Sequence, residues 1–79
     1  MKRRGYAPVY EKLAALLREE RLRAGLTQAA LAAKLGRPQS FIAKYERGER
    51  QLDLIEFLLL VRALGVRSAP LVQRLERLL

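Results

Sequence analysis

Apolar residues recur along the chain at the three- and four-residue spacing of amphipathic helices, and glycines interrupt this spacing at intervals. No stretch alternates apolar and polar residues in the two-residue period of a half-buried strand. Glycine is enriched where a helix ends through a left-handed residue, so the glycines mark predicted helix ends. The predicted fold class is therefore all-α, with helices divided by four glycines: Gly25, Gly36, Gly48 and Gly65.

The first predicted helix begins near Pro8, which suits a first helical turn, and runs to about Ala24. Arg21 lies one turn beyond Leu17, at the edge of the apolar stripe, where a charged group requires a partner. The stripe expected to face the core consists of Val9, Leu13, Leu16, Leu17 and Ala24.

Residues 27–48 predict two short helices joined by a tight turn, a helix-turn-helix. Thr27 is suited to cap the first, because its hydroxyl can accept a hydrogen bond from a backbone N–H of the first turn. The second spans 38–47, with Ile42 and Tyr45 on one face. The opposite face is polar and basic and carries no carboxylate: Gln39, Ser40, Ala43, Lys44 and Arg47.

This polar face suits the edges of base pairs in a DNA major groove. Glutamine can bond to adenine, lysine to guanine and serine to either, while alanine leaves room for a thymine methyl group. The alternative interpretation is an ordinary solvated helix face. Phe41, on the same helix, is expected to be exposed and to pack under the N-terminal arm or against sugar-phosphate. The base-contacting candidates are Gln39, Ser40, Ala43 and Lys44.

Residues 53–79 predict two further helices. Asp53 followed by Glu56 is close to the capping-box pattern of a helix start. This helix is expected to end before Gly65, and Ser68 is expected to cap a last helix that runs to the end of the sequence. The core stripe expected on the helix after Asp53 is Leu54, Phe57, Leu58, Val61 and Leu64.

The same region holds more apolar residues than one helix face uses. They either complete the core of a small domain or form the surface of a homodimer. Two-fold pairing suits DNA reading, because two recognition helices on a palindrome multiply the discrimination of one. The candidate dimer residues are Ile55, Leu59, Leu71, Leu75 and Leu78.

The formal net charge of +8 and the pI near 10.9 favour a polyanionic partner, nucleic acid first and an acidic membrane surface second. Residues 1–50 hold 12 Lys/Arg and 5 Asp/Glu, so most of the positive charge lies in the half that contains the helix-turn-helix. Residues 1–7 form a basic arm, which is either a frayed end or a DNA contact. The arm candidates are Lys2, Arg3 and Arg4.

The chain contains no cysteine and no histidine. Disulfides, the usual zinc sites and the Ser-His-Asp and Cys-His catalytic sets are therefore excluded, and neither an enzyme nor a metal or cofactor site is expected. No apolar run approaches the roughly 20 residues that span a bilayer, and the N-terminus lacks the apolar segment of a signal peptide. These features predict a cytoplasmic protein in one domain, 8–79, behind the arm.

Residues 13–66 resemble the Cro/lambda-repressor type of helix-turn-helix, the Xre family of transcriptional regulators. The matching motifs are Leu-Thr-Gln at 26–28, Leu-Ala at 31–32, Leu-Gly at 35–36, Ile42, Tyr-Glu-Arg-Gly at 45–48 and Ala-Leu-Gly at 63–65. The resemblance implies a compact five-helix bundle, prokaryotic or phage-encoded, whose third helix enters the major groove.

The resemblance also implies roles for individual residues. It places Gln28 where the family has a glutamine that binds phosphate and braces the first residue of the recognition helix. It matches Arg21 and Glu46 to a partly buried ion pair between the first and third helices. Gln39, Ser40 and Lys44 fall on base-contacting positions. The phosphate-contacting candidates are Gln28, Arg37, Arg47 and Arg50.

The leading hypothesis is a sequence-specific regulator of transcription, a repressor that binds a palindromic operator in double-stranded DNA as a homodimer. The alternative is an antitoxin or adaptor whose main role is to bind a second protein, with DNA autoregulation secondary. In that case the apolar C-terminal helix would form the partner surface.

Overall fold

The computed structural model describes residues 4–79, and the regular structure in this range is helical throughout. The predicted all-α class with five α-helices is confirmed. The elements are a short 3-10 helix, η1 (Arg4–Tyr6), and the α-helices α1 (Ala7–Arg23), α2 (Gln28–Leu35), α3 (Gln39–Glu46), α4 (Leu54–Leu64) and α5 (Ser68–Glu76).

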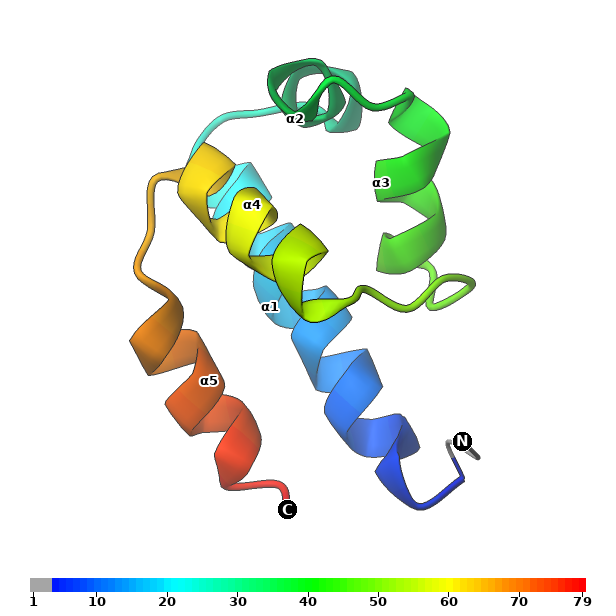
Figure 1. Cartoon of the computed structure of the whole chain (residues 1–79), viewed down its shortest axis with the longest axis vertical. Coiled ribbons are helices and arrows are strands. Elements are labelled where there is room, and N and C mark those ends of the chain that lie inside the picture. The colour runs from blue at the N-terminus through cyan, green and yellow to red at the C-terminus, as the bar shows by residue number, and fades with distance from the viewer. Residues whose placement is uncertain (1–3) are drawn as a thin grey trace.

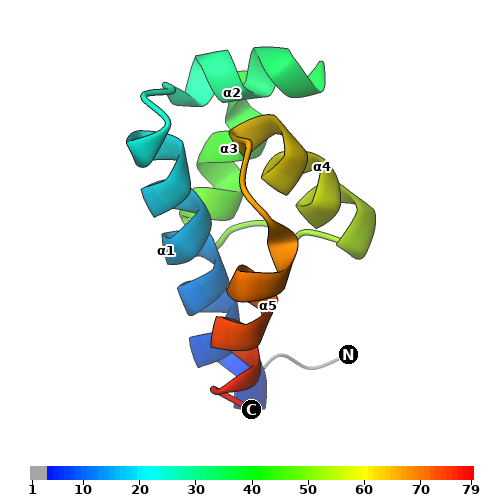
Figure 2. The same ribbon diagram turned by 90° about the vertical axis from the view of Figure 1, so that its left-hand side faces the viewer.

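The longest helix, α1, forms the spine of the bundle, and α3, α4 and α5 each pack against it (Figure 1). The helix-turn-helix pair α2 and α3 contact each other closely, and α2 also contacts α4. Helix α5 lies beside the N-terminal half of α1, away from α3, as the two views agree (Figure 2). The outer side of α3 is therefore left uncovered by the other helices.

The core draws one or more residues from each α-helix. Leu17, Leu31, Ile42 and Leu60, from the first four helices, have no exposed surface. In α1, Leu16 and Leu17 are buried as expected, whereas Ala24 is exposed at the helix end. Arg21 is buried with them, only 6% exposed, so it lies inside the core stripe and not at its edge.

The stripe predicted for α4 was partly wrong. Its buried residues follow one helical face: Phe57, Leu60, Val61 and Leu64. Leu54 and Leu58, expected in the core, are 69% and 43% exposed. Apolar residues occupy nearly every position of this helix, so the sequence fits more than one stripe. Packing against α1 and α2 selects the stripe that contains Leu60.

The last helix also differs from expectation. Leu71, a candidate dimer residue, is 4% exposed and belongs to the core. It is therefore not available to a dimer surface. Leu75 is half-buried and packs against the same core. Helix α5 starts at Ser68 and ends at Glu76, short of the predicted end at Leu79. Ser68 is the first helical residue and Arg67 is the N-cap, so the expected cap by the Ser68 hydroxyl is not formed.

Side-chain caps and glycines set both ends of α2 and of α4, as predicted. Thr27 Oγ1 accepts a hydrogen bond from Ala30 N at 3.0 Å at the start of α2. The capping box of α4 is complete, with Asp53 accepting from Glu56 N and Glu56 accepting from Asp53 N. Gly36 ends α2 at a φ of 65°, a left-handed conformation that L side chains rarely adopt. No helix among residues 4–79 is long and apolar enough to cross a membrane.

Candidate nucleic-acid interface

Helix α3 presents one buried side and one open side. Ile42 and Tyr45 are 0% and 2% exposed and face the core. Gln39, Ser40 and Lys44 are exposed on the other side. Three of the four base-contacting candidates therefore share the open side of α3.

Ala43 is a correction, since it was expected on the open side and is only 7% exposed. The cause is the packing of α3 against both α1 and α2, which buries a wider arc than one face. Little of Ala43 is available to a thymine methyl group in this structure.

Phe41 is a second correction, being 7% exposed where an exposed ring was expected. The guanidinium carbons of Arg37 and Arg50 lie 4.2 and 4.8 Å from the centroid of its ring. At such distances a cation is attracted to the face of an aromatic ring. The ring also meets Tyr45 edge-on at 6.0 Å. Phe41 thus anchors two of the phosphate-contacting candidates.

A buried ion pair joins α1 to the last turn of α3. Arg21 donates to Glu46 through Nε at 2.7 Å and through Nη2 at 3.0 Å, with side chains 8% and 4% exposed. Arg21 Nη1 also donates to the carbonyl of Leu26 at 2.9 Å. The hydrogen bond with Glu46 raises the pKa of Arg21. The structure thus brings together the two residues that the sequence paired.

The same carboxylate begins a chain of hydrogen bonds that reaches the first residue of α3. Gln28 Nε2 donates to Glu46 Oε1 at 3.0 Å. Gln39 Nε2 in turn donates to Gln28 Oε1 at 2.6 Å. Each amide keeps a second N–H, and the Gln39 carbonyl keeps its acceptor sites. Gln39 is therefore held in one orientation while it keeps the donor and acceptor that adenine requires.

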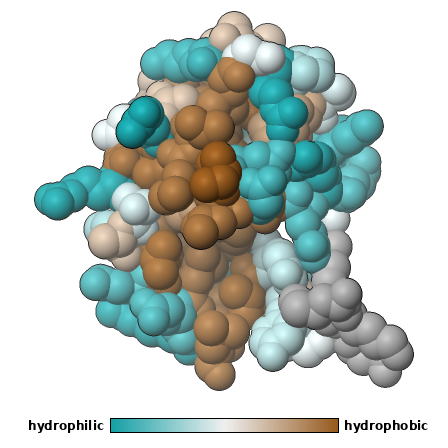
Figure 3. Space-filling view, viewed as in Figure 1, coloured by the Kyte–Doolittle hydropathy of each residue, from teal (hydrophilic) through white to brown (hydrophobic). Residues whose placement is uncertain are grey.

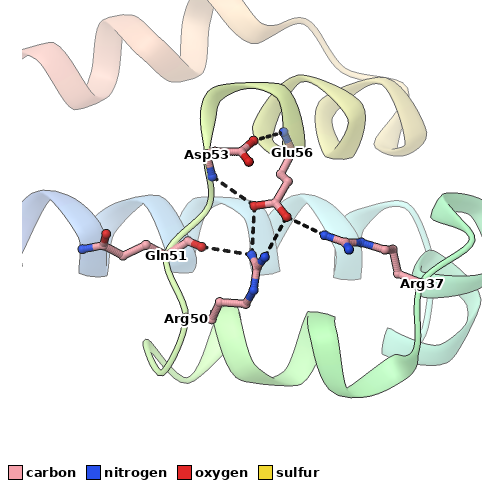
Figure 4. Close-up of polar contacts among 5 residues, drawn as sticks. All are labelled: Arg37, Arg50, Gln51, Asp53 and Glu56. Atoms are coloured by element: carbon pink, nitrogen blue, oxygen red, sulfur yellow. Dashed lines mark hydrogen bonds and ion pairs between the residues drawn. The ribbon is translucent and has the colours of Figure 1, made fainter.

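The arginines that flank α3 share one carboxylate of α4 (Figure 4). Arg50 donates to Glu56 through Nη1 at 2.9 Å and Nη2 at 2.8 Å, and to the carbonyl of Gln51 at 3.0 Å. Arg37 Nη2 donates to the same Glu56, and the backbone N–H of Asp53 donates at 3.0 Å. The hydrogen bonds from Arg50 and Asp53 lower the pKa of Glu56 to about 2. Glu56 is thus ionised at neutral pH and bonded to both flanking arginines.

The third arginine proposed for phosphate contact is also paired. Arg47, at the end of α3, donates to Glu49 at 2.8 and 3.1 Å, and both side chains are more than half exposed. This pair raises the pKa of Arg47 and lowers that of Glu49. Exposed pairs of this kind contribute little to stability and are easily exchanged for another partner.

Sequence reasoning missed the cluster around Glu56. The capping box explained this residue, so its side chain was not assigned a second role. The large Phe41, expected at an exposed position of this helix, was the available signal that other side chains pack against it. Two of the three arm candidates, Lys2 and Arg3, lie outside the residues that the structure describes. The third, Arg4, is the first residue of η1, and the structure describes only its backbone. No group of three acidic, histidine or cysteine side chains suited to a metal ion occurs among residues 4–79.

Comparison with known proteins identifies the fold. The helix-turn-helix family matches residues 17–71, which hold the whole of α2, α3 and α4. The chain belongs to the Cro/C1-type helix-turn-helix family. This is a family of DNA-binding transcription regulators and not of enzymes. No protein with a curated description matches the chain.

Solved structures agree with the family. An XRE-family like protein from Pseudomonas syringae pv. tomato str. DC3000 is 48% identical, with a TM-score of 0.83 over 89% of this chain and 85% of that one. The wild-type restriction-modification controller protein C.Esp1396I is 26% identical, with a TM-score of 0.79 over 89% of this chain and 92% of that one. The C.Esp1396I tetramer bound to its natural 35 base-pair operator matches over the same shares with a TM-score of 0.77.

The Arg21–Glu46 pair yields a stability prediction. Glu46→Ala leaves the Arg21 guanidinium buried without its carboxylate, and we expect it to lower the free energy of unfolding by about 3–5 kcal/mol. The double variant Arg21→Met, Glu46→Leu removes both charges, and we expect its free energy of unfolding to fall less than that of Glu46→Ala. Urea unfolding of the three proteins measures the difference. A double variant less stable than the single one would contradict this account.

The low pKa of Glu56 yields a pH prediction. The folded state holds this pKa at about 2, compared with 4.5 for an ordinary glutamate. The ionised Glu56 carboxylate therefore makes its full contribution to the free energy of unfolding above pH 4.5. This contribution is lost as the pH falls towards 2. Because both arginines are partly exposed, we expect the loss to be about 1–2 kcal/mol. In Glu56→Gln the free energy of unfolding should fall less between pH 5 and 2. Glu20→Gln serves as the control, and identical curves for the wild type and Glu56→Gln would exclude the effect.

Proposed function

We propose that this chain is a sequence-specific regulator of transcription that binds double-stranded DNA with α3 in the major groove and acts as a repressor. The observation that carries the proposal is the open edge of α3. Its exposed residues are Gln39, Ser40 and Lys44, and the amide of Gln39 is held by Gln28. A pre-oriented glutamine reads a base at a lower entropic cost than a mobile one.

Charge supports the same partner. The sequence carries +8 overall, and the described arginines near α3 lie at its two ends. Cations on either side of a recognition helix are placed to contact the phosphates that border the groove, while the helix between them contacts bases. The C.Esp1396I relative, a controller protein solved with its operator, supports a regulatory role by similarity. The proposed phosphate contacts are Gln28, Arg37, Arg47 and Arg50.

We further propose that the chain binds a palindromic operator as a homodimer. An apolar band crosses α4 and continues towards the end of α5 (Figure 3). The exposed apolar residues of α4 include Ile55 and Leu59, which are 62% and 49% exposed, and Leu78, beyond the end of α5, is 47% exposed. Leu54 and Leu58 of the same helix, which were expected in the core, are exposed as well. Contiguous apolar surface of this kind is typical of a protein interface.

The alternative role as an antitoxin or adaptor would place a different protein on the apolar C-terminal helix, α5. Both proposals use exposed apolar surface, so surface chemistry alone does not separate them. The oligomeric state does separate them, because a homodimer forms from the purified chain and a heteromeric adaptor requires its partner.

The first test separates base contacts from phosphate contacts. Bound sequences are selected from a random DNA pool, and affinities are then measured at several salt concentrations. Gln39→Ala is expected to lower discrimination at one base pair by about 1–3 kcal/mol. Arg47→Ala is expected to weaken binding to all sequences alike and to reduce the salt slope by about 1. Arg77→Ala, beyond α5, controls for net charge, and equal losses on selected and random DNA for both variants would refute the division.

The second test concerns the dimer. The double variant Ile55→Gln, Leu59→Gln removes apolar surface without adding charge, and we expect it to shift the chain from dimer to monomer in sedimentation experiments. Leu22→Gln, at an exposed apolar position of α1, should leave the equilibrium unchanged. A wild-type chain whose mass stays that of a monomer at all concentrations, with and without operator, would rule out the homodimer.

A further inference from the structure

The carboxylate of Glu56 bridges the two ends of the recognition helix. Arg37 precedes α3 and Arg50 follows it, and both guanidinium groups donate to Glu56 from the first turn of α4 (Figure 4). Both also lie over the ring of Phe41. One aromatic ring and one carboxylate therefore hold the two cations that flank the proposed base-reading surface.

The two arginines remain accessible to DNA although they are paired. Their side chains are 41% and 39% exposed, whereas that of Glu56 is 14% exposed. Each guanidinium has five N–H donors, of which Glu56 and Gln51 occupy only part. A phosphate can therefore approach from the solvent side, but it meets arginines whose charge Glu56 already partly neutralises.

This arrangement acts unequally on different DNA. Binding to arbitrary sequence depends on how many phosphate charges the protein neutralises, and it falls steeply with salt. Binding to a matching sequence adds base contacts and a fixed register, in which arginines held in place lose little freedom. A carboxylate that competes with phosphate for the arginines therefore weakens binding to DNA of arbitrary sequence more than binding to a matching sequence.

We propose that Glu56 is a specificity-determining residue of this regulator: its carboxylate holds Arg37 and Arg50 in place and competes with DNA phosphate for them. The inference rests on the proposed function and deepens it. In this proposal Glu56 acts through the arginines, as a positioning residue, and contacts no base or phosphate itself. Glu49 offers a contrast, because both side chains of its pair with Arg47 are more than half exposed.

The test uses Glu56→Gln. Glutamine keeps the size of the side chain and can still accept from Asp53 N, since capping boxes use Glu or Gln at this position. The matched control is Glu20→Gln, which removes the same charge from another arginine-bound glutamate, on α1. Affinities of the wild type and both variants are measured on a duplex selected from a random pool and on a random duplex, across a series of salt concentrations.

We expect Glu56→Gln to bind the random duplex about tenfold more tightly at low salt, with a salt slope steeper by about 1. Affinity for the selected duplex should rise less. The specificity ratio, which is the affinity for the selected duplex divided by that for the random duplex, should therefore fall several-fold. Glu20→Gln should leave the ratio unchanged. Parallel losses on both duplexes, or a change equal to that of Glu20→Gln, would overturn the proposal.

A second variant keeps the test decisive if Glu56→Gln folds poorly. Glu56→Asp preserves net charge but shortens the side chain, so the carboxylate no longer reaches both arginines. The specificity ratio of Glu56→Asp should fall as well, and an unchanged ratio would overturn the proposal. If the wild-type chain binds selected and random duplexes equally, the proposed function itself fails. A discriminating wild type with unchanged variants contradicts the role of Glu56 alone.

Discussion

The buried ion pair between Arg21 and Glu46 is the interaction on which the site depends. Burying two charges is costly unless each is fully bonded. Here the guanidinium binds the carboxylate twice and a backbone carbonyl once, and Gln28 donates to the same carboxylate. Because this set of bonds requires one arrangement of α1, α2 and α3, the angle of α3 and the orientation of Gln39 follow from it.

Helix α4 binds the residues on either side of α3. Glu56 binds the arginines before and after α3, while Ile55 and Leu59 on the same helix remain exposed. The surface proposed for dimerisation and the anchor of the recognition helix are therefore parts of one short, capped helix. In a two-fold dimer, the position of α4 would set the separation of the two recognition helices, and half-site spacing on DNA depends on that separation.

Local chemistry made much of this structure predictable from the sequence. Thr27, Asp53 and the left-handed glycines determine helix ends through bonds to nearby residues. The family resemblance supplied the Arg21–Glu46 pair and the bracing of Gln39 by Gln28. The α4 stripe was not predictable in the same way, because apolar residues fit several faces and packing chooses among them. The burial of Phe41 depends on Arg37 and Arg50, which no periodicity in the sequence connects to it.

The net charge of the molecule is a poor guide to the positive charge available to DNA around α3. The formal charge is +8, yet Arg37, Arg47 and Arg50 each have a carboxylate partner within hydrogen-bond distance. Paired arginines attract phosphate less strongly than free ones, because the carboxylate offsets part of their field. In the proposed interface, Lys44 and the amide and hydroxyl groups beside it would then account for a larger share of the discrimination between DNA sequences. A small basic domain with unpaired arginines would bind any duplex tightly, whereas one with paired arginines depends more on the bases it reads.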